Sequence, residues 1–159
     1  MLQIVKGNLL DLAENKEFDI IVHGCNCFNA MGAGIALQIK RRYPSAYLAD
    51  QRTLSGDIRK LGDYTFGKWT SNTQDHSFVI INAYTQFGMA RAGENVFSYI
   101  AFELILQKLS CKFPGLRYGF PRIGQGLAGG DPQRIDALLE KFAKLIECTG
   151  GSVTLVELN

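Results

Sequence analysis

Short apolar runs alternate along the chain with segments whose apolar residues recur at helical spacing. The run DIIVHGC at residues 19–25 is typical of a buried strand, because β-favouring residues follow one another between polar flanks. The run FVIINAY at residues 78–84 has the same character, and a polar turn at residues 71–77 separates it from the preceding run. The predicted strands are completed by shorter runs at residues 2–6, 63–70, 116–120 and 152–158.

Helical spacing predicts helices between these strands. Residues 32–43 carry apolar side chains on one side, and Pro44 is expected to end that helix. A short helix is expected at residues 45–54. Farther on, Asn95 is positioned to cap an amphipathic helix that runs to Leu109.

The final predicted helix has the clearest start signal. Asp131 is a favoured capping residue, and Pro132 suits the first helical position. The helix is expected to end near Gly150. Strands that alternate with helices in this way indicate an α/β fold with three layers, in which helices cover both faces of a central mixed sheet. A length of 159 residues suits a single domain over residues 1–159.

Charge and composition narrow the range of functions. The net charge is only +2, with acids and bases mixed along the chain, which gives no support for a nucleic-acid groove or a face for anionic membranes. No apolar run approaches the ~18 residues of a membrane span. The start, MLQIVKGNLL, lacks the basic and apolar segments of a secretory leader, so we expect a cytoplasmic protein.

The cysteines do not indicate a metal site. Cys25 and Cys27 flank Asn26, whereas Cys111 and Cys148 lie far away in sequence, so no spacing suggests zinc. We expect reduced and mostly buried thiols, and packing is the favoured role for the first two because nothing indicates a lowered thiol pKa. The sequence predicts no metal and no cofactor.

A polar segment after the strand at residues 19–25 is the first candidate binding loop. Ligands in α/β sheets bind beyond the carboxyl ends of strands, and a helix N-terminus attracts phosphate. Gly32 and Gly34 would let a ligand approach the backbone, while Asn26 and Asn29 suit sugar hydroxyls. A turn that only caps the helix is the alternative for a lone G-x-G. The strand, the two asparagines and the helix start together favour a ligand loop.

The segment FPRIGQGLAGGD at residues 120–131 is the second candidate binding loop. It carries glycines at positions 124, 126, 129 and 130, between a predicted strand and a predicted helix. Backbone N–H groups in such a loop can form a cradle for an anion. It matches neither the dinucleotide-binding fingerprint nor a P-loop. A flexible surface loop is the alternative, but two glycine-rich loops of this kind predict two walls of one cleft.

The motifs together resemble the macro domain family. They are V-K-G-N-L near the start, H-G-C-N-C-x3-M-G-A-G-I-A-x-Q-x3-R-Y-P in the first loop and helix, and P-R-I-G-Q-G-L-A-G-G-D in the second loop. They span residues 5–131 in the family's order. The chain is most similar to the branch that holds ADP-ribose 1″-phosphate phosphatases and terminal ADP-ribose glycohydrolases. The resemblance implies a cleft for ADP-ribose.

The resemblance also implies roles for individual residues. Asn8 and Leu9 correspond to the loop that holds adenine, although many relatives have Asp at the first of these positions. Asn26 corresponds to a contact of the distal ribose, and Cys25 and Asn29 complete the expected contacts of this loop. The expected diphosphate loops comprise Gly32, Ala33, Gly34 and Ile35, and Ile123, Gly124, Gln125, Gly126, Leu127 and Ala128. The aromatic residue that stacks on adenine in relatives is missing, because Val156 falls near its place.

Two departures from the family pattern bear on the chemistry. Gln86 stands where glycohydrolases of this branch have a catalytic Lys, and Gln86 cannot carry positive charge or form a Schiff base. The catalytic Asp of those enzymes directly follows the Gly-Leu of the second loop, whereas Ala128 follows it here and Asp131 comes three residues later. Deglycosylation through a lysine is therefore disfavoured.

The expected catalytic residues are His23, Asn26 and Asp131. His23 matches a catalytic His of the phosphatase branch, yet a His inside an apolar strand also suits a buried neutral role. Asp131 can act either as a helix cap or as a group that orients water. Arg122 can be either a solvated charge or a support for the second loop.

Four functions are compatible with the sequence. Hydrolysis of ADP-ribose 1″-phosphate is preferred, because the H-G-C-N-C motif is present and the Lys is absent. Removal of ADP-ribose from protein or nucleic acid is the second hypothesis. A reader that binds ADP-ribose without turnover and a site for another nucleotide are the others. The expected partners are ADP-ribose derivatives and, under the second hypothesis, ADP-ribosylated protein or nucleic acid.

Overall fold

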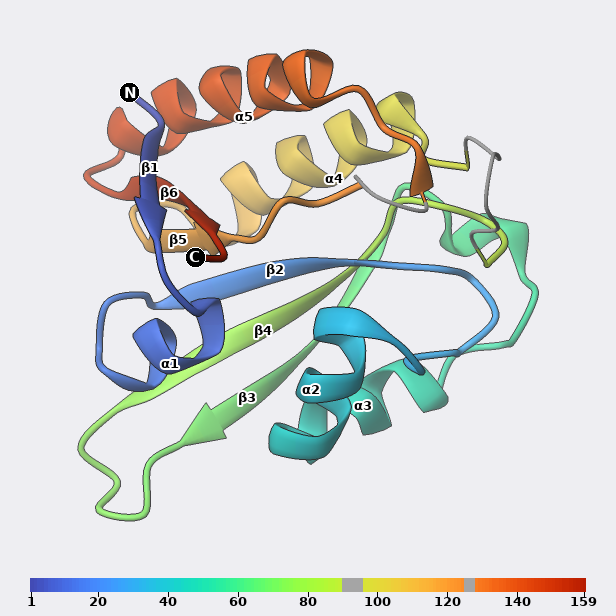
Figure 1. Cartoon of the computed structure of the whole chain (residues 1–159), viewed down its shortest axis with the longest axis horizontal. Helices are drawn as coiled ribbons and strands as arrows, with labels where there is room; N and C mark the ends of the chain where they lie inside the picture. The colour runs from blue at the N-terminus through green and yellow to red at the C-terminus, as the bar shows by residue number, and fades with distance from the viewer. Residues whose placement is uncertain (90–95, 125–127) are drawn as a thin grey trace.

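A six-stranded sheet forms the centre of the computed structural model, which describes residues 1–89, 96–124 and 128–159 (Figure 1). The strand order is β1-β6-β5-β2-β4-β3. Neighbouring strands run parallel, except that β3 and β4 form an antiparallel hairpin. The strands are β1 (Gln3–Lys6), β2 (Ile20–Cys25), β3 (Tyr64–Thr70), β4 (Ser77–Tyr84), β5 (Arg117–Phe120) and β6 (Ser152–Glu157).

Helices cover both faces of this sheet (Figure 1). Helices α4 and α5 lie on one face, and α1, α2 and α3 lie on the other. The helices are α1 (Leu9–Glu14), α2 (Gly34–Arg42), α3 (Pro44–Gln51), α4 (Tyr99–Lys112) and α5 (Pro132–Glu147), with a short 3-10 helix at Ile58–Lys60. The predicted three-layer α/β/α architecture with a mixed sheet is confirmed.

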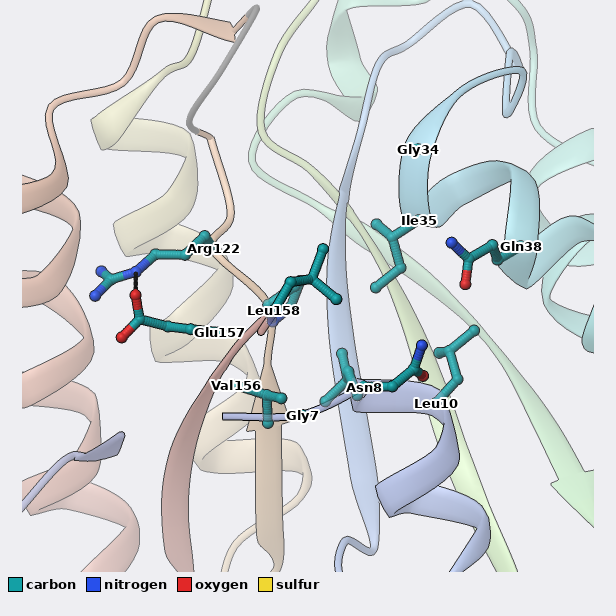
Figure 2. A pocket seen from close by; sticks show the side chains of 12 residues that line it. Gly7, Asn8, Leu10, Gly34, Ile35, Gln38, Arg122, Val156, Glu157 and Leu158 are labelled. Carbon is teal, nitrogen blue, oxygen red and sulfur yellow. Dashed lines mark hydrogen bonds and ion pairs between the residues drawn. The ribbon is translucent and has the colours of Figure 1, made fainter. Parts of the chain in front are cut away.

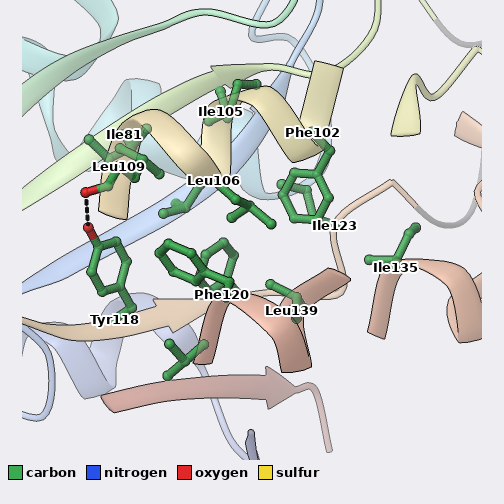
Figure 3. Close-up of a cluster of buried hydrophobic side chains, with 14 of the residues drawn as sticks. Ile81, Phe102, Ile105, Leu106, Leu109, Tyr118, Phe120, Ile123, Ile135 and Leu139 are labelled. Atoms are coloured by element: carbon green, nitrogen blue, oxygen red, sulfur yellow. Dashed lines mark hydrogen bonds between the residues drawn. The ribbon is translucent and has the colours of Figure 1, made fainter. Parts of the chain in front are cut away.

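Each face of the sheet has its own hydrophobic core, because burial of apolar area is the main driving force for packing the layers. Figure 3 shows the core under α4 and α5, where the aromatic rings of Phe102, Tyr118 and Phe120 meet aliphatic side chains from both helices. The Tyr118 hydroxyl donates to the Leu109 carbonyl (3.2 Å), so its polar end is satisfied inside the core. The second core contains Leu10, Ile21 and others under α1, α2 and α3.

Direct backbone contact between α3 and β3 fixes part of the second core. A methyl group added at Gly67 of β3 would lie 2.3 Å from the Ala46 backbone nitrogen and 2.6 Å from its Cα. Only a residue without a side chain lets the first turn of α3 approach the strand this closely. Pro44 ends α2 as predicted and also starts α3, since proline suits the first turn of a helix.

The structure departs from the expected elements in two places. Helix α1 was not predicted, because its six residues are too few to show helical periodicity. Helix α4 begins at Tyr99 rather than after Asn95, since the Ser98 hydroxyl accepts the Ala101 N–H (3.1 Å) and caps it. Asn95 itself lies outside the described residues.

The thiols divide into two classes. Cys25 and Cys27 are buried at the end of β2, as expected, whereas Cys111 and Cys148 are exposed near the ends of α4 and α5. The expectation of mostly buried thiols is therefore wrong for the helical pair, which occupies the solvent side of its helices. In the described part of the chain, no helix is long and apolar enough to cross a membrane.

Candidate functional site

A cavity of about 480 Å³ opens at the carboxyl ends of β1, β5 and β6 (Figure 2). This is the edge of a parallel sheet at which ligands bind, because loops and helix N-termini converge there. Ile35 and Gln38 of α2 lie on one side of the cavity, and Arg122 and Glu157 lie on the other. The lining residues are Gly7, Asn8, Leu9, Leu10, Gly34, Ile35, Gln38, Pro121, Arg122, Val156, Glu157 and Leu158.

Four of the predicted ligand residues meet in this cavity: Asn8, Leu9, Gly34 and Ile35. No ligand role was predicted for Gln38 or Pro121, although both stand in the quoted motifs. None was predicted for Glu157 or Leu158, because their neighbours in the cavity come from distant parts of the chain. Val156, at the place of the missing aromatic residue, also lines the wall.

Asn8 has a structural role at the start of α1. Its Oδ1 accepts the Asp11 N–H (3.0 Å), which satisfies one of the free amides of the first turn. Figure 2 shows the Asn8 side chain at the edge of the cavity. The cap fixes the orientation of the amide, so its Nδ2 group is held at a defined place at the edge of the cavity.

Arg122 supports the second loop rather than standing free in solvent. Its Nη1 donates to both carboxylate oxygens of Asp136 on α5 (2.7 and 2.9 Å), and its Nε pairs with Glu157 at the end of β6 (3.4 Å). The hydrogen bonds with Asp136 raise the pKa of Arg122 above its ordinary value. The two ion pairs tie the exit of β5 to two neighbouring elements.

The N-terminus of α2 is open to a ligand. Ala33 occupies the capping position without a side-chain hydrogen bond, so the first-turn amides lack the usual side-chain partner. Gly34 has φ +58°, and a side chain added there or at Gly32 would meet no atom of the described residues within 4 Å. The first turn carries no acidic residue. N–H groups without a side-chain cap, positive dipole potential and space open among the described residues therefore coincide at this point.

Asn26 organises the loop that follows β2. Its Oδ1 accepts the N–H groups of Phe28 (2.9 Å) and Ala30 (3.5 Å), and its Nδ2 donates to the Ala30 carbonyl (3.0 Å). The half-buried amide thus holds a compact turn. An amide NH₂ group has two donors, and the described residues supply an acceptor for one of them.

Asn29 anchors the same loop to a different part of the chain. It has φ +58°, a conformation that Asn tolerates better than most residues. Its Nδ2 donates to the Thr53 carbonyl (2.8 Å), and its Oδ1 accepts from the Lys60 ammonium (2.5 Å). Asn29 therefore holds the loop toward Thr53 and Lys60, which the sequence did not single out.

The second loop closes on itself at its base. Gly124 has φ +74° and packs against the Phe97 ring, where an added methyl group would lie 2.4 Å from a ring carbon. The Gly130 N–H donates to the Gly124 carbonyl (2.7 Å), and the Ala128 carbonyl accepts from the Phe97 N–H (3.3 Å). Ile123 is buried at the loop entrance. The predicted contacts Gln125, Gly126 and Leu127 lie outside the described residues.

Asp131 caps α5 at the end of this loop. Its side chain accepts the Gln133 N–H (3.0 Å), and its own N–H donates to the Tyr99 hydroxyl (2.8 Å). The capping role is observed. The carboxylate is exposed, so it remains accessible to water and to a ligand.

His23 lies in the interior of the sheet and is 0% exposed. It is paired in register with Asn82 of β4, and its Nε2 lies 2.7 Å from the Asn82 Oδ1. Burial lowers the pKa of His23 to about 4, and the hydrogen bond with Asn82 opposes this shift. Cys25 is buried beside it, and burial raises the pKa of the Cys25 thiol well above its ordinary value. Both groups are therefore neutral at pH 7.

The lowered pKa of His23 predicts a loss of stability in mild acid. The unfolded chain protonates its His near pH 6.5, whereas the folded chain resists protonation until about pH 4. Between these values the unfolded state binds more protons than the folded state. The free energy of unfolding therefore decreases by up to about 3 kcal/mol as the pH is lowered. Urea unfolding between pH 7.5 and pH 4.5 measures this slope.

Two variants test whether His23 causes this pH dependence of the free energy of unfolding. His23→Phe is expected to flatten the dependence on pH, although it is also less stable at every pH because Asn82 loses its partner. His76→Gln removes the other imidazole, at a half-buried position, and is the matched variant against which the slope of His23→Phe is compared. An unchanged slope in His23→Phe would exclude His23 as its source.

Comparison with known proteins identifies relatives of this chain. No protein-family model matches it. It is 33% identical over 153 residues, 92% of this chain and 93% of the other, to the uncharacterised 17.5 kDa protein of the tk–vs intergenic region of Enterobacteria phage T4. The chain belongs to the family of this phage protein.

The chain has the macrodomain fold. The macrodomain of Mycobacterium tuberculosis DarG superposes with a TM-score of 0.70 at 23% identity, covering 99% of this chain and 97% of that one. Thermosipho africanus DarTG in complex with ADP-ribose superposes with a TM-score of 0.73 at 17% identity, covering 99% of this chain and 41% of that one. The predicted macro fold is thus confirmed.

One further relative of this macrodomain carries an activity in its name. The DNA ADP-ribosyl glycohydrolase of Mycobacterium tuberculosis is 37% identical over 68 residues. The match covers 43% of this macrodomain and 17% of the glycohydrolase.

Proposed function

We propose that this macrodomain binds ADP-ribose and hydrolyses the bond to a substituent on the anomeric carbon of the distal ribose. The observation that carries the proposal is the open N-terminus of α2, with Gly34 beside a cavity of about 480 Å³. Cavities of this size suit small ligands. Similarity to DarTG, which was solved in complex with ADP-ribose, adds support.

The cavity suits the adenosine end of the ligand. Leu9, Ile35 and Val156 offer apolar surface to a flat base, while Asn8 offers an amide at the rim. The diphosphate is then expected at the first turn of α2, where amides without a side-chain cap and the helix dipole favour negative charge. The second glycine-rich loop, held at its base by the Gly130–Gly124 hydrogen bond, is expected to face the same phosphates.

The distal ribose is expected beyond the diphosphate, near Asn26 and Asp131. The second Nδ2–H of Asn26 suits a ribose hydroxyl. The exposed Asp131 carboxylate suits the orientation of a water molecule toward the reacting bond. His23, which is fully buried on Asn82, serves in this proposal to hold β2 and β4 in place below Asn26.

Two substrates share the proposed bond. ADP-ribose 1″-phosphate carries a phosphate on the anomeric carbon, and the similarity of the first loop to the phosphatase branch favours it. ADP-ribosylated DNA carries a base there, and the match to a DNA ADP-ribosyl glycohydrolase favours this second candidate. Gln86 argues against a lysine-based mechanism for hydrolysis of ADP-ribosylated DNA. Its Nε2 donates to the Gly88 carbonyl (2.9 Å) and carries no charge.

Phosphorus NMR of ADP-ribose 1″-phosphate, with and without the protein, tests the first substrate. Release of inorganic phosphate beside ADP-ribose is the expected result. A parallel reaction with an ADP-ribosylated oligonucleotide tests the second. Shifted resonances without turnover of either substrate would leave a binding module, and unperturbed spectra in both samples would remove ADP-ribose as the ligand.

Asp131 variants separate capping from chemistry. Asn is as good a helix cap as Asp but is not a base, so Asp131→Asn should keep the free energy of unfolding and lose about 100-fold in rate. Asp131→Ala should lose the same activity and also about 1 kcal/mol of stability. Initial rates and urea midpoints measure both effects. Full activity in Asp131→Asn would restrict this residue to capping.

A further inference from the structure

We propose that this macrodomain has a second anion site, which takes a phosphate group in a separate cavity at Lys60. The cavity has a volume of about 360 Å³ and lies where β4 ends and β3 begins, near the 3-10 helix at Ile58–Lys60. Its walls include the hydroxyl-bearing residues Thr53, Thr65 and Tyr84. It shares no lining residue with the cleft at α2.

Lys60 is the unusual residue of this cavity. It is only 8% exposed, yet its ammonium group contacts neutral partners: the Asn29 Oδ1 (2.5 Å), the Thr53 Oγ1 (2.9 Å) and the Tyr84 ring (5.2 Å to the centroid). No carboxylate of the described residues lies within 4.0 Å of it. A buried cation without an anion is costly, so the site favours a ligand that supplies negative charge.

The acidic residues in the cavity wall do not match this charge, because each has its own cation. Asp57 is bound by Arg59 (3.0 Å), and this hydrogen bonding lowers the pKa of the Asp57 carboxyl. Asp63 is paired with Lys108 (3.5 Å). Lys60 is therefore the cation that remains for a ligand in the cavity.

Asp50 is the other buried charge of this region. Its Oδ1 accepts the Tyr84 hydroxyl hydrogen bond (2.8 Å), and it does not line the cavity. The Tyr84 ring thus stands between a buried carboxylate at its hydroxyl and a buried ammonium over its face.

An adjoining hollow of about 560 Å³ indicates how the rest of the ligand would lie. The two hollows share Asp63, Tyr64 and Thr65, and the second adds Arg52 and the half-exposed ring of Phe66. A phosphate on Lys60 would leave an attached group to extend along Phe66 and Arg52. Free phosphate and the phosphate of a nucleotide share this chemistry, and the ring of Phe66 gives a base a surface on which to stack.

An NMR titration resolved at single backbone amides tests the site in the unaltered protein. Inorganic phosphate is added in the presence of saturating ADP-ribose, which fills the first cleft. We expect saturable shifts at Thr53, Lys60 and Thr65. Shifts confined to the N-terminus of α2, or the absence of saturable shifts, would overturn the second site. Because the readout is assigned by residue, a titration without ADP-ribose still separates the two sites if ADP-ribose does not bind.

Variants and a second probe complete the test. Lys60→Met removes the charge but keeps the chain length, so phosphate binding at these amides should weaken about 10-fold or more. Lys144→Met, at an exposed lysine on α5, is the control and should bind like the parent. Equal binding in Lys60→Met and the parent would overturn the proposal. AMP in place of phosphate separates the sources: tighter binding with shifts at Phe66 indicates a nucleotide, and equal affinity indicates free phosphate.

Discussion

Gly34→Glu is expected to weaken ADP-ribose binding about 100-fold, which corresponds to nearly 3 kcal/mol. The new carboxylate would enter the open space at the first turn of α2, where the diphosphate is proposed to lie. Two negative groups would then compete for the same amides and the same dipole potential. Isothermal titration of ADP-ribose measures the loss.

Gly34→Gln is the matched control for this substitution. Glutamine has nearly the same size and suffers the same strain at φ +58°, but it carries no charge. We expect it to weaken binding much less than glutamate, and the difference between the two variants isolates the electrostatic part. Equal affinities for the glutamate variant and the parent would show that the diphosphate does not lie at α2.

Gly67→Ala is expected to cost about 3 kcal/mol or more in the free energy of unfolding. The added methyl group would lie 2.3 Å from the backbone nitrogen of Ala46. Backbone atoms cannot rotate away as a side chain can, so α3 must move off β3 and open the second core. Urea unfolding followed by circular dichroism measures the change.

Gly88→Ala provides the comparison for this stability loss. A methyl group there would meet no atom of the described residues within 4 Å, and the residue has no left-handed backbone conformation. Its free energy of unfolding should stay within about 0.5 kcal/mol of the parent. A similarly small effect at Gly67 would mean that α3 is free to shift, and that the close contact does not fix the layers.

The elements with strong local signals were predictable from the sequence. Strand β2 follows from a run of mostly apolar, β-favouring residues, and α5 follows from Asp131, Pro132 and a regular apolar stripe. Helix α1 was not predictable in this way, because one cap and six residues give too little periodicity. The start of α4 was misplaced, since Asn95 and Ser98 are both acceptable caps and only the packing of the loop chooses between them.

The site was predictable where a motif describes the backbone. The glycines and the uncapped start of α2 are properties of a local segment, so the sequence located them. The ties of Arg122 to Asp136 and of Lys60 to Asn29 join residues far apart in the chain, and no local pattern encodes them. The surroundings of His23 were not predictable for the same reason. The motif suggested a catalytic role, whereas the hydrogen bond that His23 forms in the sheet comes from Asn82 of a neighbouring strand.

The difference in exposure between the two pairs of thiols gives a way to measure local unfolding at the end of β2. A maleimide reagent can reach Cys111 and Cys148 in the folded state, whereas Cys25 and Cys27 are enclosed and have raised pKa values because of their burial. Modification of the second pair must therefore wait until the end of β2 separates from its neighbours. The rate at which Cys25 and Cys27 are labelled would therefore report how often the end of β2 opens under native conditions. A ligand that stabilises the cleft would lower this rate.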